Sequence, residues 1–383
     1  MTDYEMILLV CLAAGGFIIP FLTRLIQMPN AAGEIIYGLL LGFFFMQEMP
    51  HSIQFLGELG FVLLMYLAGL EIDFDRIQKT PAAEILIYLL MYLVVGVASF
   101  AAAFLLNLPL IFGLIFLTSA VGLLFPVLKD CQILHTGSGQ KLLLIGTIGE
   151  IISLIGLTVF ILQTRYGFSL ASLVHLLEIL FFGFLVFLSL KIYRYVTWWH
   201  PNLAKLVMHS ENTFESSVRG NLAHMLVFVA VASMLNLELI IGAFIGGMIF
   251  AAIFSNREEL LHKMGSFGYG FLVPIFFITV GMKFELVDFL DFNVLKFALL
   301  ITVLIFLVRL VASPVLLLTG LSTREMIATG LALTFPLTLL VALATFGLDA
   351  GVLDKSHTAS ILLAAILTSV IYPVLFKKMV SAG

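Results

Sequence analysis

Glu150 and Arg309 are charged residues set deep inside long apolar segments of this chain. Glu150 lies within LLLIGTIGEIISLIGLTVFIL, residues 142–162, and Arg309 lies within LIFLVRLVASP, residues 304–314. A charge at the centre of a membrane helix costs about 2.5–3.5 kcal/mol on insertion scales. Such residues therefore pair with one another or face a water-filled cavity, and they are the first candidates for chemistry.

The carboxyl group of Glu150 can bind either a proton or a small cation. Burial in a medium of low dielectric constant favours the neutral, protonated acid, and the deprotonated carboxylate is a hard oxygen ligand for a metal cation. Because one group cannot easily hold both, this competition is the minimal chemistry of an antiporter. Arg309 stays charged and exchanges no protons, which favours a structural charge partner. A purely structural buried Glu–Arg pair is the alternative interpretation.

Two predicted helices, 108–128 and 323–347, contain residues that weaken a regular helix. These residues are Thr118, Ser119, Gly122 and Pro126 in the first helix, and Thr334, Pro336 and Thr338 in the second. We expect these two helices to occupy corresponding positions in two internal repeats of the chain, which are described below. A pair of interrupted helices in such positions indicates a transport site, because their unwound carbonyls and hydroxyls can ligate a cation. Ordinary proline kinks, which are common in membrane helices, are the alternative.

The predicted site combines these two sets of residues. The expected helix breaks are at Gly122, Pro126 and Pro336. The expected cation- and proton-binding positions are Glu150, Thr118, Ser119, Gly149, Ser153 and Thr338, with Glu150 as the ligand of a monovalent metal cation and Arg309 as the charge partner.

The composition indicates an integral membrane protein. We expect an all-α fold, in which membrane-spanning helices position these groups. Of the 383 residues 62% are hydrophobic and 11% are charged, against roughly 25% charged residues in soluble domains. The net charge is −4, with no basic block and no Gly-rich phosphate loop, which argues against nucleic-acid binding. The two cysteines have no metal-binding spacing. We expect a transporter rather than an enzyme, with no cofactor besides the transported ions.

Thirteen segments are long and apolar enough to be spanning helices, which need about 20 apolar residues each. They are 5–27, 30–46, 53–71, 82–106, 108–128, 140–163, 169–198, 216–235, 237–254, 265–282, 293–319, 323–347 and 353–376. Of the 19 Lys and Arg residues, fourteen fall on the side of the odd-numbered loops and the C-terminal end, and four fall on the other. The positive-inside rule then predicts an N-terminus outside and a C-terminus in the cytoplasm.

Similar segments recur seven predicted helices apart. IIYGLLLGFFF resembles LIIGAFIGGMIF, which aligns Gly38 and Gly42 with Gly242 and Gly246, and LLMYLAGLEIDF resembles PIFFITVGMKFEL. An odd offset gives the two copies opposite orientations. This predicts two inverted six-helix repeats joined by a linker helix, as in many secondary transporters. Coincidence between greasy, Gly-rich segments is the alternative.

The segments PNAAGEIIYGLLLG, LGELGFVLLMYLAGLEIDFDR, IGAFIGGMIFA and FLVPIFFITVGM closely resemble the Kef/NapA-type monovalent cation:proton antiporter family. The resemblance covers nearly the whole chain and implies a NhaA/NapA-like fold with crossed broken helices. It implies one antiporter domain, 1–383, with a mobile core (82–163 and 293–376) and a dimerisation scaffold (1–71 and 169–282). It also implies a homodimer in lipid, in a prokaryotic-type inner membrane, that works by elevator-like alternating access and contributes to pH homeostasis. Many such relatives append a cytoplasmic regulatory domain, which is not part of this chain.

The chain departs from that family where the chemistry is expected. The usual Asp-Asp, Asn-Asp or Gln-Asp pair is Gly149-Glu150 here, and two hydroxyls are missing after Ser119. The resemblance places Glu150 at the ion-binding aspartate and Arg309 at the basic residue of the eleventh helix. The leading hypothesis is a Na⁺/H⁺ or K⁺/H⁺ antiporter, with one cation exchanged for one proton. A gated cation channel and a non-transporting membrane sensor or assembly subunit are the alternatives.

Overall fold

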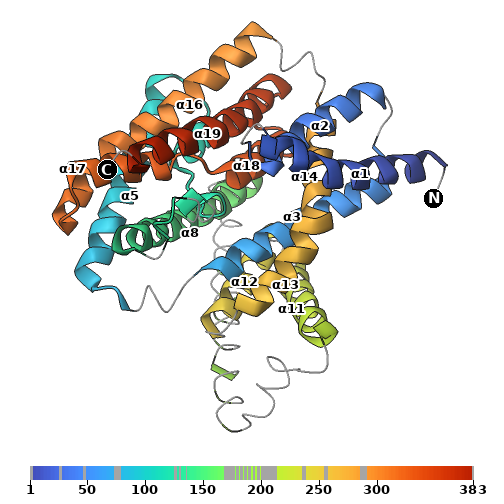
Figure 1. Ribbon diagram of the computed structural model, residues 1–383, viewed down its shortest axis with the longest axis horizontal. Coiled ribbons are helices and arrows are strands. Elements are labelled where there is room, and N and C mark those ends of the chain that lie inside the picture. Colours follow the sequence, from blue (N-terminus) through green and yellow to red (C-terminus); the bar gives the residue numbers. More distant parts are fainter. Residues whose placement is uncertain are drawn as a thin grey trace. The chain divides into compact units, whose positions relative to one another are not determined.

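The computed structural model describes most of the chain as helices. The described residues are 3–25, 28–45, 49–72, 79–124, 127–128, 131–134, 136–167, 214–234, 239–253, 258–284 and 291–381, with a few scattered positions between 168 and 213. Every regular element within these ranges is helical (Figure 1). Pro126 and most of the predicted helix 169–198 lie outside them.

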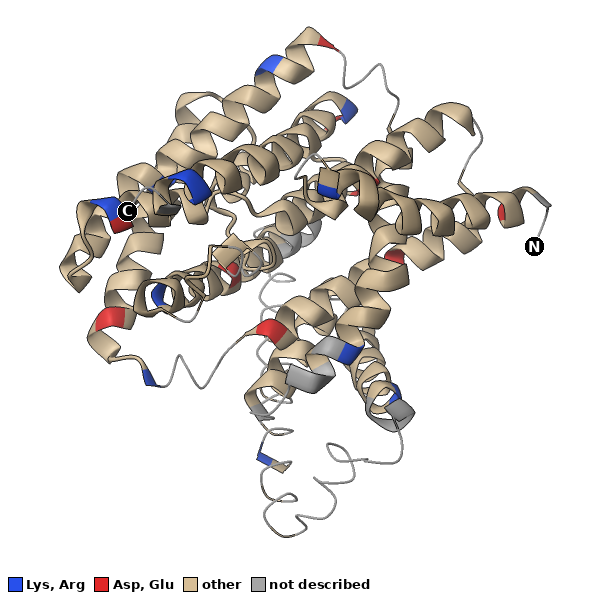
Figure 2. Ribbon diagram, in the orientation of Figure 1, with Lys and Arg blue, Asp and Glu red and all other residues tan. Residues whose placement is uncertain are grey.

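The described helices are those of an integral membrane protein. Seven of them are long and apolar enough to cross a membrane, or up to eight if one bent pair forms a single span. Figure 2 shows that the helices run for long stretches without a charged residue. The predicted total of thirteen spans stays a prediction.

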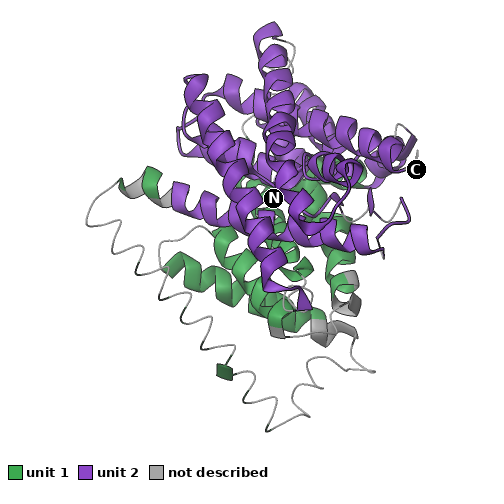
Figure 3. Ribbon diagram, turned by 90° about the vertical axis from the view of Figure 1, so that its left-hand side faces the viewer, with its two compact units in different colours: residues 1–16, 48–75, 161–276 green, residues 17–47, 76–160, 277–383 purple. Residues whose placement is uncertain are grey.

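Contacts divide the chain into two compact units, which Figure 3 colours separately. Unit 1 comprises residues 1–16, 48–75 and 161–276, and unit 2 comprises residues 17–47, 76–160 and 277–383. Helices α1 (Asp3–Leu25) and α14 (Val273–Met282) have residues in both units. Residues 17–47, which are predicted to belong to the scaffold, lie in unit 2.

Unit 1 is built on α3 (His51–Glu71), α11 (Phe214–Met234) and α12 (Leu239–Ile253). Its remaining elements are α13 (Glu258–Phe267) and the π-helical turn η1 (Gly268–Leu272). Helix α12 packs against both α3 and α11. A Cβ atom at Gly69 of α3 would overlap the Phe244 carbonyl of α12, and one at Gly247 of α12 would overlap the Tyr66 carbonyl of α3. The two backbones approach this closely because both positions are glycine.

Unit 2 contains a longer series of helices. They are α2 (Asn30–Phe44), α5 (Ala82–Leu105), α6 (Ile111–Leu117), α8 (Gly137–Tyr166), α16 (Phe292–Ala312), the 3₁₀ helix η2 (Ser313–Thr319), α17 (Thr323–Ala332), α18 (Leu337–Asp349) and α19 (Lys355–Ser381). Helix α16 packs against α19 and α5, α5 packs against α6, and α18 packs against α19.

Local sequence sets where several of these helices begin. Pro29, Pro50 and Pro81 directly precede α2, α3 and α5. Proline fits there because the first N–H groups of a helix have no partner within the helix. Helix α17 begins with a capping box, in which the Ser322 hydroxyl accepts from the Glu325 amide and the Glu325 carboxylate accepts from the Ser322 amide.

Candidate functional site

Glu150 lies in α8 and is buried, with 3% of its surface exposed. Its Oε2 atom accepts a hydrogen bond from the Val121 amide at 3.3 Å. Val121 belongs to the non-helical segment that follows α6. The segment after α6 therefore supplies a backbone hydrogen-bond donor to the buried carboxyl group of Glu150.

The chain leaves α6 at Thr118, and hydrogen bonds hold the following segment against α8. Thr118 has extended backbone angles, φ −53° and ψ 126°. The next amide, of Ser119, donates to the Ser153 hydroxyl at 2.9 Å, and that hydroxyl donates to the Gly149 carbonyl at 2.7 Å. The sites predicted at Ser119, Gly149, Glu150 and Ser153 are therefore linked by contacts between α8 and this segment.

Arg309 binds the carbonyl end of α6. Its guanidinium donates to the Phe116 carbonyl at 3.0 Å, to the Thr118 carbonyl, and to the Ile305 carbonyl of its own helix at 2.8 Å. The last carbonyls of a helix have no partner within the helix and attract positive charge. Arg309, which is 1% exposed, thus satisfies carbonyls of the broken helix, while Glu150 binds an amide a few residues further on.

A second break separates α17 from α18, whose axes differ by 42°. The Leu337 amide donates to the Phe335 carbonyl at 2.9 Å, and Pro336 between them has φ −82° and ψ 59°, which is an inverse γ-turn. The Thr334 hydroxyl donates to the Gly330 carbonyl at 2.5 Å. Thr338 lies in the first turn of α18 and is half-buried. Its place beside Glu150 stays a prediction.

Gly146 of α8, about one turn before Glu150, contacts both breaks. A Cβ atom at this position would lie 3.2 Å from Val121 Cγ2 and 3.6 Å from Leu333 Cδ2. Val121 belongs to the segment after α6, and Leu333 belongs to the segment between α17 and α18. The two interrupted segments therefore meet α8 close to the buried carboxyl group. Gly122 lies next to Val121 in the first of them.

Sequence reasoning missed Tyr92 and the Val121 amide. Tyr92 lies in α5, is 3% exposed, and donates from its hydroxyl to Ser119 Oγ at 3.2 Å. A tyrosine in an apolar helix gives no distinctive signal, and a backbone amide carries no side-chain signal at all. The only hint in the sequence is Gly149, whose missing side chain leaves room beside Glu150.

A buried carboxylate on a membrane helix, with two interrupted segments against that helix, is an arrangement typical of secondary transporters. The chain belongs to the family described as sodium/hydrogen exchanger, transmembrane, whose sequence model matches residues 9–381.

Individual proteins resemble the chain over most of its length. YjbQ of Bacillus subtilis (strain 168) is 28% identical over 94% of this chain and 62% of its own length. The Na(+)/H(+) antiporter of Enterococcus hirae is 24% identical over 93% of each protein. The solved structure of the sodium proton antiporter MjNhaP1 from Methanocaldococcus jannaschii aligns with a TM-score of 0.65 at 15% identity, over 97% of this chain and 95% of that one. The last likeness shows a shared fold.

Proposed function

We propose that this protein is a secondary-active transporter that exchanges a monovalent cation, Na⁺ or K⁺, for a proton. The observation that carries the proposal is the buried Glu150 carboxyl group, held by the Val121 amide where two interrupted segments meet α8. Membership of the sodium/hydrogen exchanger family supports the same reaction class. The chain spans 62% of the length of YjbQ.

Glu150 binds the proton in one part of the cycle and the cation in the other. Hydroxyl and carbonyl oxygens of the segments after α6 and before α18 complete the coordination of the cation, which they can do because these segments are not committed to helical hydrogen bonding. Arg309 stays charged, keeps the carbonyl end of α6 in place and balances the carboxylate charge. Protonation and cation binding then exclude one another.

An inverted repeat of the Kef/NapA type carries this site, and close glycine contacts support it. Gly281 of α14 lies against the Ile35 carbonyl and the Leu39 amide of α2, within unit 2. Gly69 of α3 lies in the same way against the Phe244 carbonyl and the Met248 amide of α12, within unit 1. The two contacts are equivalent when Ile35 corresponds to Phe244 and Leu39 corresponds to Met248. That correspondence pairs Gly38 with Gly247, whereas the sequence alignment pairs Gly38 with Gly242.

The remaining features of the proposal rest on the family resemblance and, for the orientation of the termini, on the distribution of Lys and Arg residues. The protein forms a homodimer with thirteen spans, an outer N-terminus and a cytoplasmic C-terminus. The core helices, which include α5, α6, α8 and α16 to α19, carry the site across the membrane by elevator-like movement against the scaffold.

The test is cation-driven proton flux in proteoliposomes supplied with Na⁺, K⁺ or Li⁺. Saturable exchange that depends on pH is the expected result. Unitary single-channel currents would contradict exchange and indicate a channel. Cation binding without any flux would also contradict it, and would indicate a sensor or an assembly subunit.

A further inference from the structure

We propose that the hydroxyl of Tyr92 is a positioning group of the cation site. It occupies the space that a side chain at position 149 would fill, and it holds the side chain of Ser119 beside Glu150. This inference rests on the proposed exchange function. It concerns a residue of α5, a helix that contains none of the predicted site residues.

The first support is that Tyr92 and a side chain at position 149 compete for one space. A Cβ atom at Gly149 would overlap the hydroxyl oxygen of Tyr92 and the ring atoms Cζ and Cε1. The overlap involves the polar end of the ring rather than its apolar base. The phenol is therefore directed at the backbone of the residue that precedes Glu150, where it takes the place of a side chain from α8.

The second support is the polar connection that the hydroxyl completes. Tyr92 Oη donates to Ser119 Oγ at 3.2 Å, and the Ser119 amide donates to Ser153 Oγ at 2.9 Å. Ser153 in turn donates to the Gly149 carbonyl at 2.7 Å. Tyr92 thus fixes the side chain of Ser119 while α8 fixes its backbone. A serine oxygen that accepts one hydrogen bond keeps a second lone pair, which can face a cation.

Two other buried tyrosines of unit 2 serve as comparisons, because their hydroxyls have other partners. Tyr88, one turn earlier in α5, is 0% exposed and donates to Glu84 Oε2 at 3.1 Å. Tyr372 of α19 donates to the Thr302 carbonyl at 2.8 Å. Tyr92 differs because its hydroxyl contacts the non-helical segment that carries Ser119 and Val121. A purely structural hydroxyl would be expected to affect stability, whereas this one should affect how the site holds its ion.

The first experiment measures Tyr92→Phe in proteoliposomes, with Tyr88→Phe as the matched control. Both changes remove one buried hydroxyl from α5. We expect Tyr92→Phe to raise the apparent cation constant about three- to tenfold, the effect of losing one hydrogen bond, with the maximal rate within about twofold of the wild type. Tyr88→Phe should change neither quantity. Equal behaviour of the two variants, while the wild type exchanges normally, would overturn the inference and leave the proposed function standing.

The second experiment moves the hydroxyl group from position 92 to position 149. Gly149→Ser alone should impair exchange, because its Cβ atom overlaps the phenol, and Tyr92→Leu alone should impair it by removing the hydroxyl. The double variant returns a hydroxyl to the vacated space, so its apparent cation constant should be closer to the wild type than that of either single variant. Additive losses in the double variant would overturn the inference. A wild type without any exchange would instead overturn the proposed function, and this inference with it.

Discussion

Thr118 and Ser119 are adjacent, but their hydroxyls have different partners. Thr118 Oγ1 donates to the Leu114 carbonyl of its own helix at 2.7 Å, and the Thr118 carbonyl accepts from Arg309. Ser119 Oγ instead accepts from Tyr92. The oxygen of Ser119 is therefore the better candidate to ligate a cation, and Thr118 contributes through its backbone.

We expect Ser119→Ala to raise the apparent cation constant more than it lowers the maximal rate, since it removes a ligand rather than a step of the cycle. Thr118→Ala should have a smaller effect, because it keeps the carbonyl that Arg309 binds. Thr338→Ala should resemble Ser119→Ala if the second break faces the same ion. The measurement is the cation dependence of the initial flux. Equal effects of Ser119→Ala and Thr118→Ala would contradict this assignment of roles.

The sequence predicts the charged residues of the site better than its hydrogen bonds. Glu150 and Arg309 stand out because a charge inside an apolar segment is costly and rare. The Val121 amide could not be predicted, because every residue except proline has such a group and only the fold selects one. Tyr92 could not be predicted either, because its contact with Gly149 joins positions far apart in the sequence.

Helices predicted from apolar runs agree with the structure where the run forms one helix. The predicted helix 82–106 corresponds to α5, Ala82–Leu105. The predicted helix 293–319 corresponds to α16 followed directly by η2, which ends at Thr319. The prediction 108–128 covers α6, which ends at Leu117. Hydropathy cannot locate that end, because most residues from Ala120 to Leu124 are apolar too.

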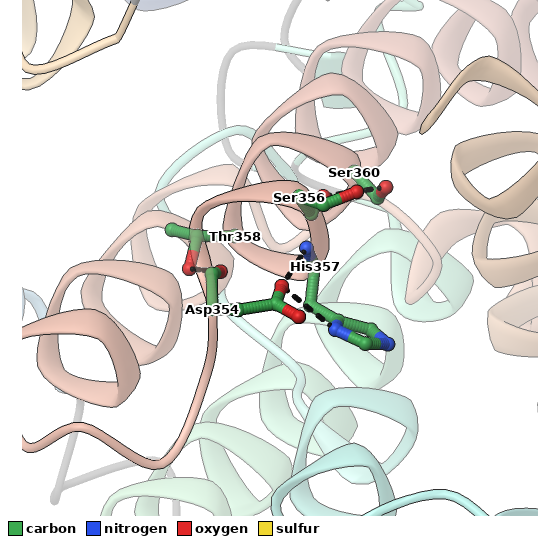
Figure 4. A network of polar contacts seen from close by, with 5 residues as sticks. All are labelled: Asp354, Ser356, His357, Thr358 and Ser360. Atoms are coloured by element: carbon green, nitrogen blue, oxygen red, sulfur yellow. Dashed lines mark hydrogen bonds and ion pairs between the residues drawn. The ribbon is translucent and has the colours of Figure 1, made fainter. Parts of the chain in front are cut away.

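The side chain of Asp354 caps the N-terminal end of α19. Asp354 Oδ1 accepts from the His357 amide at 2.7 Å and lies 2.8 Å from the His357 ring nitrogen Nδ1 (Figure 4). The His357 ring packs edge-on against Phe112 of α6 and Phe297 of α16. Partial burial opposes ionisation of Asp354, but the hydrogen bonds from His357 outweigh it, so the pKa of Asp354 lies below its ordinary value of 3.8.

We expect Asp354→Ala to lower the free energy of unfolding by about 1 kcal/mol, the usual cost of losing such a cap. A carboxyl group with a lowered pKa in the folded state stabilises fully above its ordinary pKa and loses this effect as the pH falls through the folded value. The difference from the wild type should thus be present at about pH 6 and shrink below about pH 4. The measurement is thermal unfolding in detergent at both pH values.

Asp349→Ala is the matched control for this cap. Asp349 has the same side-chain exposure as Asp354, 63%, and forms an exposed ion pair with Lys283 at 3.6 Å. Exposed ion pairs contribute little to stability, so this variant should unfold close to the wild type. A loss at Asp349 as large as that at Asp354 would mean that surface charge, rather than capping, stabilises this end of the molecule.

At the scale of the whole molecule, the charge of the site determines whether transport generates a current. Gly149 adds no acid beside Glu150, and Arg309 stays protonated, so the predicted site carries either one proton or one monovalent cation. Its net charge is then the same in both directions of the cycle. We expect electroneutral exchange, which responds to a pH gradient and hardly at all to voltage. Sustained transport current at clamped voltage would show that another titratable group takes part.

The central claim is that one carboxyl group, Glu150, alternates between proton and cation. Its most direct test is cation-driven proton flux in proteoliposomes containing Glu150→Gln, which keeps the size of the side chain and removes its titratable charge. The control is Glu34→Gln, the same change at a carboxyl group of α2 that is 4% exposed. We predict a folded Glu150→Gln protein without exchange, residual exchange in Glu150→Asp, and wild-type exchange in Glu34→Gln. Wild-type exchange rates in Glu150→Gln would contradict the claim.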